Sequence, residues 1–122
     1  MGGVRPGIAA SAAILMTINN EITERRFRIN RLMELGKMDE ARSELDALRE
    51  LEGESAFVLN KLGVIAVSSG KFDQGKAYFE KALTVDEGYV QAYNNLGNIY
   101  REMGDLDRAI EYYQLALKYD EE

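Results

Sequence analysis

The 122-residue chain contains no cysteine, no histidine and no tryptophan, and its only proline is Pro6. Without cysteine it cannot form disulfides, zinc–thiolate sites or iron–sulfur clusters, and it has no thiol nucleophile. Without histidine it lacks the commonest general base and the commonest metal ligand. The scarcity of proline in a long chain that mixes polar and apolar residues favours helices.

The carboxylates do not follow a pattern typical of an active site. Pairs such as Asp39–Glu40 and Asp105–Asp107 are spaced like helix-end and solvated charges. The sequence shows no EF-hand spacing and no glycine-rich phosphate loop before a helix. We therefore expect no catalytic residue, no metal site and no cofactor.

The charge and the hydropathy of the chain limit the class of partner. The chain carries 21 Asp and Glu against 15 Lys and Arg, a net charge of -6, which argues against a nucleic-acid partner. The longest apolar run, residues 7–18, is shorter than the ~20 residues that span a bilayer as a helix. Only Arg5 is charged before this run, unlike a typical signal peptide. We expect a cytoplasmic protein without a membrane span.

Three segments of similar sequence, LGKMDEA, SGKFDQG and MGDLDRA, follow one another at a fixed step. Their glycines, Gly36, Gly70 and Gly104, are separated by 70−36 = 34 and 104−70 = 34 residues. Agreement at several positions in one register indicates an internal repeat. The same step links Asp39, Asp73 and Asp107; the small residues Ala41, Gly75 and Ala109; the large residues Leu45, Phe79 and Tyr113; and Leu48, Ala82 and Ala116.

Each copy has the apolar spacing of two amphipathic helices. In the first copy the second helix is predicted over 38–51, and in the second copy the helices are predicted over 57–68 and 72–83, with Ser55 as an N-cap. In the third copy Gly104 separates the two helices, and Asp105 or Asp107 caps the second. The predicted buried positions are Ala41, Leu45 and Leu48 in the first copy, and Tyr89, Tyr93, Leu96, Tyr100, Leu106, Ala109, Ile110, Tyr113 and Leu117 in the third.

On these residues the chain resembles the tetratricopeptide repeat (TPR) family. That family's pattern is a large residue, Leu-Gly, Tyr, then Ala, an aromatic and Ala, with Pro near the end. The third copy has Tyr93, Leu96, Gly97, Tyr100, Ala109, Tyr113 and Ala116 at these places, and the second has Leu59, Leu62, Gly63, Ala66, Gly75, Phe79 and Ala82. The chain departs from the pattern in two ways: the first copy has Arg28-Ile29 in place of Leu-Gly, and the Pro position holds Gly53, Glu87 and Glu121.

The resemblance implies an all-α fold, a right-handed α-solenoid of three helical hairpins over residues 22–55, 56–89 and 90–122. Residues 1–21 then form an additional N-terminal apolar helical segment. The implied function is protein–protein interaction as a scaffold or adaptor, in which the first helices of the hairpins form a concave groove that binds an extended peptide. The alternative is a structural module that self-associates through its N-terminal helix and binds no peptide.

Polar residues on the predicted first helices are the candidate groove residues. Asn is a poor helix former, and its amide both donates and accepts hydrogen bonds, as a peptide backbone requires. Asn60 and Asn94 are one repeat apart and are predicted to form an exposed ladder. Solvent-facing Asn residues without a ligand are the alternative. The candidate residues are Arg26, Asn30, Asn60, Lys61, Gln91, Asn94, Asn95, Asn98 and Arg101.

The cations among these residues suit an acidic or C-terminal segment of a protein partner. Some TPR domains clamp the carboxylates at a chaperone C-terminus with Lys and Asn on the first helix, Asn on the next, and Lys and Arg on the third. Here Arg26 and Asn30 match the first pair in kind, but Lys61, Gln91 and Asn95 do not match the rest. We therefore expect contacts directed at the peptide backbone. The basic cluster of Arg25, Arg26, Arg28 and Arg31 is interpreted as a solvated or ion-paired face, with nucleic acid or an anionic membrane as the alternative.

The N-terminal segment presents a separate apolar stripe. Ile8, Leu15, Ile22 and Ile29 are spaced by seven, Ile18 flanks the stripe, and no Gly or Pro occurs from Ile8 to Leu35. Either the chain breaks near Asn19-Asn20 and folds back as a cap, or one long helix pairs with a second molecule. We favour a homo-oligomer through Ile8, Leu15, Ile18 and Ile22.

Overall fold

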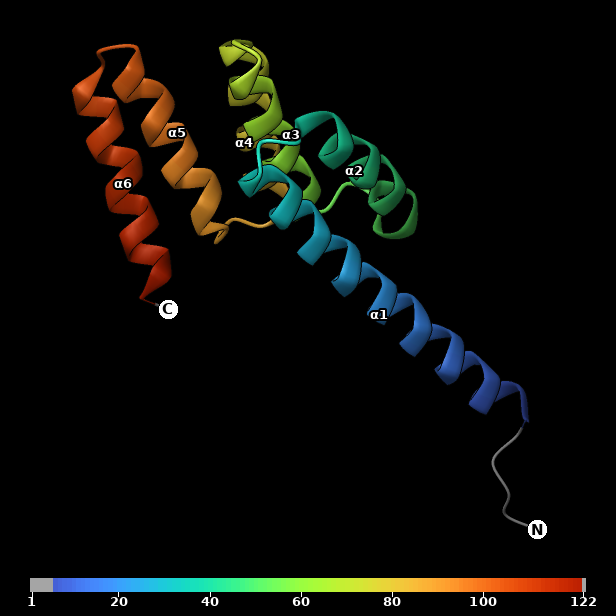
Figure 1. Cartoon of the computed structure of the whole chain (residues 1–122). Helices are drawn as coiled ribbons and strands as arrows, with labels where there is room; N and C mark the ends of the chain where they lie inside the picture. The colour runs from blue at the N-terminus through green and yellow to red at the C-terminus, as the bar shows by residue number, and fades with distance from the viewer. Residues whose placement is uncertain (1–5, 122) are drawn as a thin grey trace. The chain divides into compact units, whose positions relative to one another are not determined.

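The computed structural model describes residues 6–121, without the side chains of Pro6 and Ile8. Six helices follow one another: α1 Pro6–Glu34, α2 Met38–Glu52, α3 Ala56–Ser68, α4 Phe72–Val85, α5 Val90–Glu102 and α6 Leu106–Asp120 (Figure 1). No strand occurs within residues 6–121, so the all-α prediction is confirmed. The chain divides into two compact units, which adjoin in sequence between Gly53 and Glu54.

The repeated glycines lie in the turns between paired helices. Gly36, Gly70 and Gly104 have φ values of 75°, 78° and 82°, a conformation that side chains with a Cβ rarely adopt. This backbone requirement explains why glycine recurs every 34 residues. Two predicted N-caps are also confirmed, because the side chain of Ser55 accepts from the backbone N–H of Val58 and that of Asp105 from Arg108.

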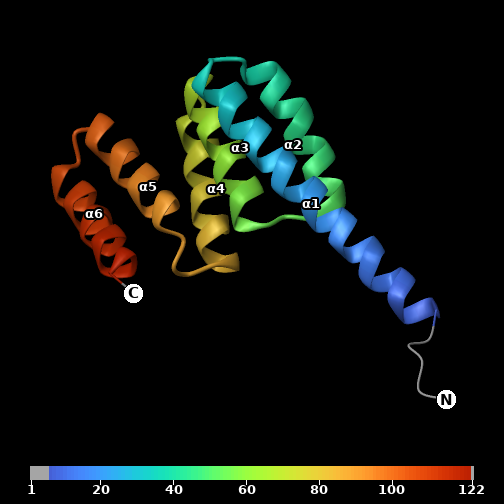
Figure 2. The same cartoon turned by 60° about the horizontal axis from the view of Figure 1, so that its bottom comes forward.

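The unit from Glu54 onward consists of two hairpins, α3–α4 and α5–α6, that lie side by side (Figure 2). α5 packs on α4 and α3, and Leu59, Phe79, Leu96 and Ile99 are buried between them. Each hairpin closes on a glycine. A Cβ on Gly63 would lie 2.5 Å from Phe79 Cε1, and one on Gly97 would lie 2.6 Å from Tyr113 Cε1. An aromatic ring of the facing helix therefore occupies the space beside each of these two glycines.

The predicted buried stripe of α6 is partly wrong. Ala109 is buried as predicted, but Leu106, Ile110 and Leu117 are 60%, 52% and 63% exposed. Among the described helices α6 packs only on α5, which it meets with its buried alanines and with its tyrosines. No described helix covers the opposite, apolar side of α6. The periodicity of the sequence alone does not show which side of a helix will be covered.

The unit that ends at Gly53 consists of α1 and α2. The predicted inward residues of α2, Ala41, Leu45 and Leu48, are fully buried, as is Ile29 of α1. α1 has 29 residues against 15 in α2, so its N-terminal half extends beyond α2 (Figure 1). The helix does not break near residues 19–20, so the fold-back cap is wrong. α1 crosses the expected boundary at residue 21, and the division into a segment 1–21 and three repeats stays a prediction.

Candidate functional site

The candidate residues of the second unit lie on α3 and α5, but not in the arrangement that was predicted. Gln91, Asn94, Asn98 and Arg101 are exposed on α5, while Asn95 is half-buried. On α3, Lys61 is half-buried with its Nζ 5.4 Å from the centre of the Phe57 ring, a cation–π distance.

Asn60 corrects the prediction of an exposed ladder. Its side chain is only 2% exposed, and its Oδ1 accepts a 2.9 Å hydrogen bond from Nδ2 of Asn95, not from Asn94. α5 packs on α3, so a side chain that would be exposed on an isolated α3 is buried in the unit. A buried amide must be hydrogen-bonded, which the pairing with Asn95 achieves.

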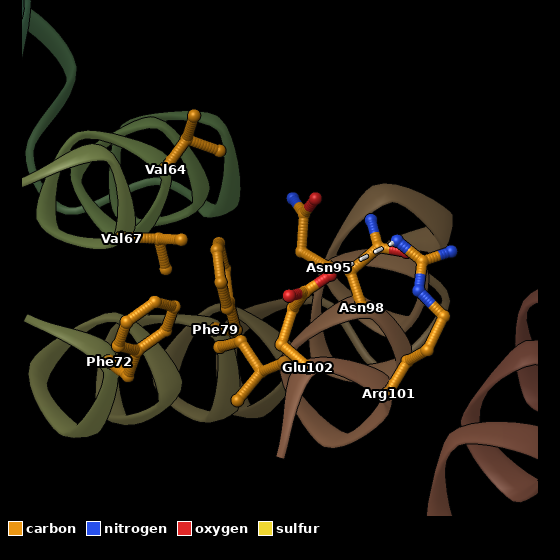
Figure 3. A pocket seen from close by; sticks show the side chains of 9 residues that line it. Val64, Val67, Phe72, Phe79, Asn95, Asn98, Arg101 and Glu102 are labelled. Carbon is orange, nitrogen blue, oxygen red and sulfur yellow. Dashed lines mark ion pairs between the residues drawn. The ribbon is translucent and has the colours of Figure 1, made fainter. Parts of the chain in front are cut away.

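A hollow of about 160 Å³ lies between α3, α4 and α5 (Figure 3). Its apolar side chains come from all three helices, and its polar side chains come from α5. The hollow is smaller than the ~300–1,000 Å³ of sites for small organic ligands, and its size suits a single side chain. The lining residues are Val64, Val67, Phe72, Phe79, Asn95, Asn98, Ile99, Arg101 and Glu102.

Two residues of the apolar wall and two of the polar wall occupy equivalent positions of successive repeats. Val64 and Asn98 are 34 residues apart, and so are Val67 and Arg101. Asn95, Asn98 and Arg101 were predicted from the sequence, whereas Val67, Phe72, Ile99 and Glu102 were not. Comparison of the polar positions of α5 with the same repeat positions in α3 would have pointed to Val67.

All four polar lining residues already have partners within the unit, Asn95 through its hydrogen bond to Asn60. The hydroxyl of Tyr113 donates a hydrogen bond to Oδ1 of Asn98, and this contact fixes the orientation of the Asn98 amide. The guanidinium of Arg101 lies 3.8 Å from the carboxylate of Glu102, and both side chains are more than half exposed. An exposed ion pair contributes little to stability, so Arg101 is available to exchange this carboxylate for that of a ligand.

Arg26 and Asn30 lie in the other unit, on α1, and do not line the hollow. Asn30 is exposed, whereas Nη2 of Arg26 is 2.7 Å from the carboxylate of Glu52. The neighbouring arginines are paired as well. Arg25 and Arg28 both reach Glu44, and Arg31 reaches Glu34, as expected for an ion-paired face. The basic cluster is thus occupied by contacts within its own unit.

Two stacked tyrosine pairs connect the helices of the second unit. The rings of Tyr100 and Tyr112 are 5.4 Å apart, and Lys76 and Arg108 lie over the Tyr100 ring. A hydrogen bond with Tyr100 raises the pKa of Lys76, and burial raises the pKa of Tyr112. The cluster joins α4, α5 and α6, and none of its members lines the hollow.

The second pair, Tyr93 and Tyr119, stacks at 5.3 Å beside Glu87. The Tyr119 hydroxyl donates to the Glu87 carboxylate at 2.9 Å, and the Tyr93 hydroxyl donates to the Glu87 carbonyl oxygen at 2.7 Å. The hydrogen bond to Glu87 and burial together raise the pKa of Tyr119 to about 12. This pair fixes the start of α5 against the end of α6.

Residues 6–121 contain no group of three or more Asp, Glu, Cys or His side chains placed to hold a metal ion. None of the helices in the described part of the chain has the length and hydropathy of a membrane span.

The helices pair into hairpins that repeat with the sequence step of 34, which defines a helical-repeat protein of the solenoid class. The tetratricopeptide repeat family model matches residues 54–122, more than half of the chain. The chain belongs to the tetratricopeptide repeat family, and it is accordingly a protein-interaction module. A search of curated proteins gives no match.

Solved structures share this fold. The crystal structure of MamA aligns with a TM-score of 0.65 and 24% identity over 82% of this chain and 58% of that one. The second TPR of Spaghetti (RPAP3), bound to the HSP90 peptide SRMEEVD, aligns with a TM-score of 0.67 and 17% identity, over 85% of this chain and 98% of that one. The crystal structure of the APC/C hetero-tetramer Cut9–Hcn1 aligns with a TM-score of 0.70 and 24% identity, over 80% of this chain and 20% of that one. The chain spans about three fifths of the MamA chain, and at these identities the likeness is one of fold.

Proposed function

We propose that the chain binds an extended peptide segment of a partner protein along α3 and α5, with one apolar side chain of the peptide in the hollow. The observation that carries this proposal is the composition of the hollow. Val64, Val67 and Phe72 offer apolar contact, while Asn95 and Asn98 beside them offer amide groups. An apolar side chain and the backbone next to it need this combination of contacts.

Arg101 favours a carboxylate next to the apolar anchor of the peptide. Its present partner, Glu102, is exposed, so a ligand carboxylate competes with a weak ion pair. The RPAP3 domain was solved with a peptide that contains both apolar and acidic residues, which supports this class of ligand. We propose an acidic segment, internal or C-terminal, without the full double carboxylate clamp, because Gln91 and Asn95 carry no charge.

A peptide array that pairs apolar anchors with internal or terminal carboxylates tests the proposal. The wild-type chain should bind a subset of these peptides, and Arg101→Ala should weaken their binding about tenfold or more, the loss expected for a charged hydrogen bond. Val64→Phe should also weaken binding, because the larger side chain occupies the hollow.

Asn94→Ala is the matched control for Asn98→Ala, since both Asn residues are exposed on α5 but only Asn98 lines the hollow. We expect Asn98→Ala to lower peptide affinity and Asn94→Ala to leave it unchanged. Equal affinities of the wild type, Asn98→Ala and Val64→Phe for every bound peptide would show that the hollow is not the binding site.

A further inference from the structure

The apolar stripe of α1 changes from buried to exposed toward the N-terminus. Ile29 is fully buried against the α1–α2 interface, Ile22 and Ile18 are half-buried, and Leu15 is 60% exposed. These residues follow one seam, with Leu15, Ile22 and Ile29 seven apart and Ile18 three after Leu15. α2 therefore covers only the C-terminal half of a seam that continues beyond it.

The uncovered half of α1 also differs from the covered half in charge. Residues 6–20 contain no Asp, Glu, Lys or Arg, whereas seven charged residues occur from Glu21 to Glu34. Ile14 and Met16 beside the seam are 59% and 67% exposed. Soluble monomers rarely leave an uncharged helix with this much apolar surface uncovered, which marks this half of α1 as an interaction surface.

We infer that the covering partner is the same half of α1 from a second copy of the chain, paired along the seam of Leu15, Ile18 and Ile22. The seven-residue spacing is that of helices that pair side by side, and the contact continues the interface that α1 makes with α2. Two uncharged surfaces meet without like-charge repulsion, and a two-fold axis brings identical seams together. The side chain of Ile8, which has the next seam position, lies outside the described residues.

The contact is small. Residues 8–22 amount to about two heptads, so we expect a dimer that dissociates on dilution. This inference does not depend on peptide binding, because the hollow lies in the other unit.

A lipid surface fits this half of α1 less well than a second copy does. Helices that lie on membranes usually carry Lys or Arg on their polar face, and residues 6–20 have none. The polar residues here, such as Ser11, Thr17 and Asn19, offer no charge to a lipid headgroup.

Light scattering of the full chain over a range of concentrations tests the inference. The wild type should reach the mass of two chains, and Leu15→Glu should halve that mass at the same concentration. Ala13→Glu is the matched control, because residue 13 lies about 200° around the helix from residue 15 and is also exposed. Ala13→Glu should keep the dimer, and so should the hollow variant Asn98→Ala.

A wild-type chain that stays monomeric at every concentration would overturn the inference, as would a dimer that persists in Leu15→Glu. Flotation with vesicles of phosphatidylglycerol and phosphatidylethanolamine separates the lipid alternative. A monomeric wild type that floats with the vesicles, when Leu15→Glu does not, would assign the seam to a membrane surface.

Discussion

The side-chain amide of Asn95 donates a 2.9 Å hydrogen bond to Oδ1 of Asn60, which lies 35 residues earlier and is almost fully buried. The bond connects the first helices of two successive hairpins, α3 and α5. Asn60 therefore acts on the polar wall of the hollow through Asn95, whose side chain it holds, and is itself out of reach of a ligand.

Asn60→Ala should lower the free energy of unfolding by about 1–3 kcal/mol, because it leaves the Asn95 amide without its buried partner. Asn94→Ala should leave stability unchanged or raise it, since Asn94 is exposed and Ala is the better helix former. Chemical denaturation measures both. Equal effects of the two substitutions would contradict the conclusion that Asn60 is buried and hydrogen-bonded while Asn94, one repeat later, is exposed.

Gly63→Ala should destabilise the chain, because the new Cβ would lie 2.5 Å from Cε1 of Phe79. The cost of overpacking, about 1–3 kcal/mol, outweighs the gain of about 1 kcal/mol that Ala brings to a helix. The first repeat has Ile29 and Leu45 at the equivalent positions, both fully buried. Phe79→Leu combined with Gly63→Ala should therefore lose less stability than the two single losses added together, in a double-mutant cycle of unfolding free energies.

Leu96→Ala should cost about 2–5 kcal/mol of unfolding free energy, because Leu96 is fully buried in the core and the substitution leaves a cavity. Leu117→Ala makes the same chemical change at a 63% exposed position and should cost about 0.5 kcal/mol or less. Similar losses at the two sites would mean that α6 is covered on its outer side in solution.

Tyr119→Phe should reduce stability at neutral pH and lose this effect in alkaline solution. The folded chain raises the pKa of Tyr119 to about 12, above the usual value of about 10, so folding favours the protonated hydroxyl. The stabilisation is complete below about pH 10 and disappears as the pH rises toward 12. The difference in unfolding free energy between wild type and variant should shrink over that interval, and a difference independent of pH would contradict the role of the Glu87 hydrogen bond.

Several features of the second unit followed from the sequence because they depend on local chemistry. Gly70 and Gly104 need positive φ, Ser55 and Asp105 satisfy the first N–H groups of a helix, and apolar spacing marks helices of this length. The candidate site was predicted less well. Three of its four polar residues were predicted, but Phe72 and Val67 belong to the site only because α4 and α3 approach α5.

By itself, the sequence determined the helices from residue 38 onward, the step of 34 residues and the resemblance to the family, because these are read from local spacing along the chain; only the structure showed that α1 is one continuous helix. Only the tertiary structure decided which apolar and polar side chains lose their water. Asn60 is buried and Leu106 is exposed, although periodicity predicts the reverse, because α5 covers α3 while no described helix covers the outer side of α6. Burial depends on which helices pack together, and a helix's own periodicity shows that it has an apolar side but does not show how many of its sides will be covered.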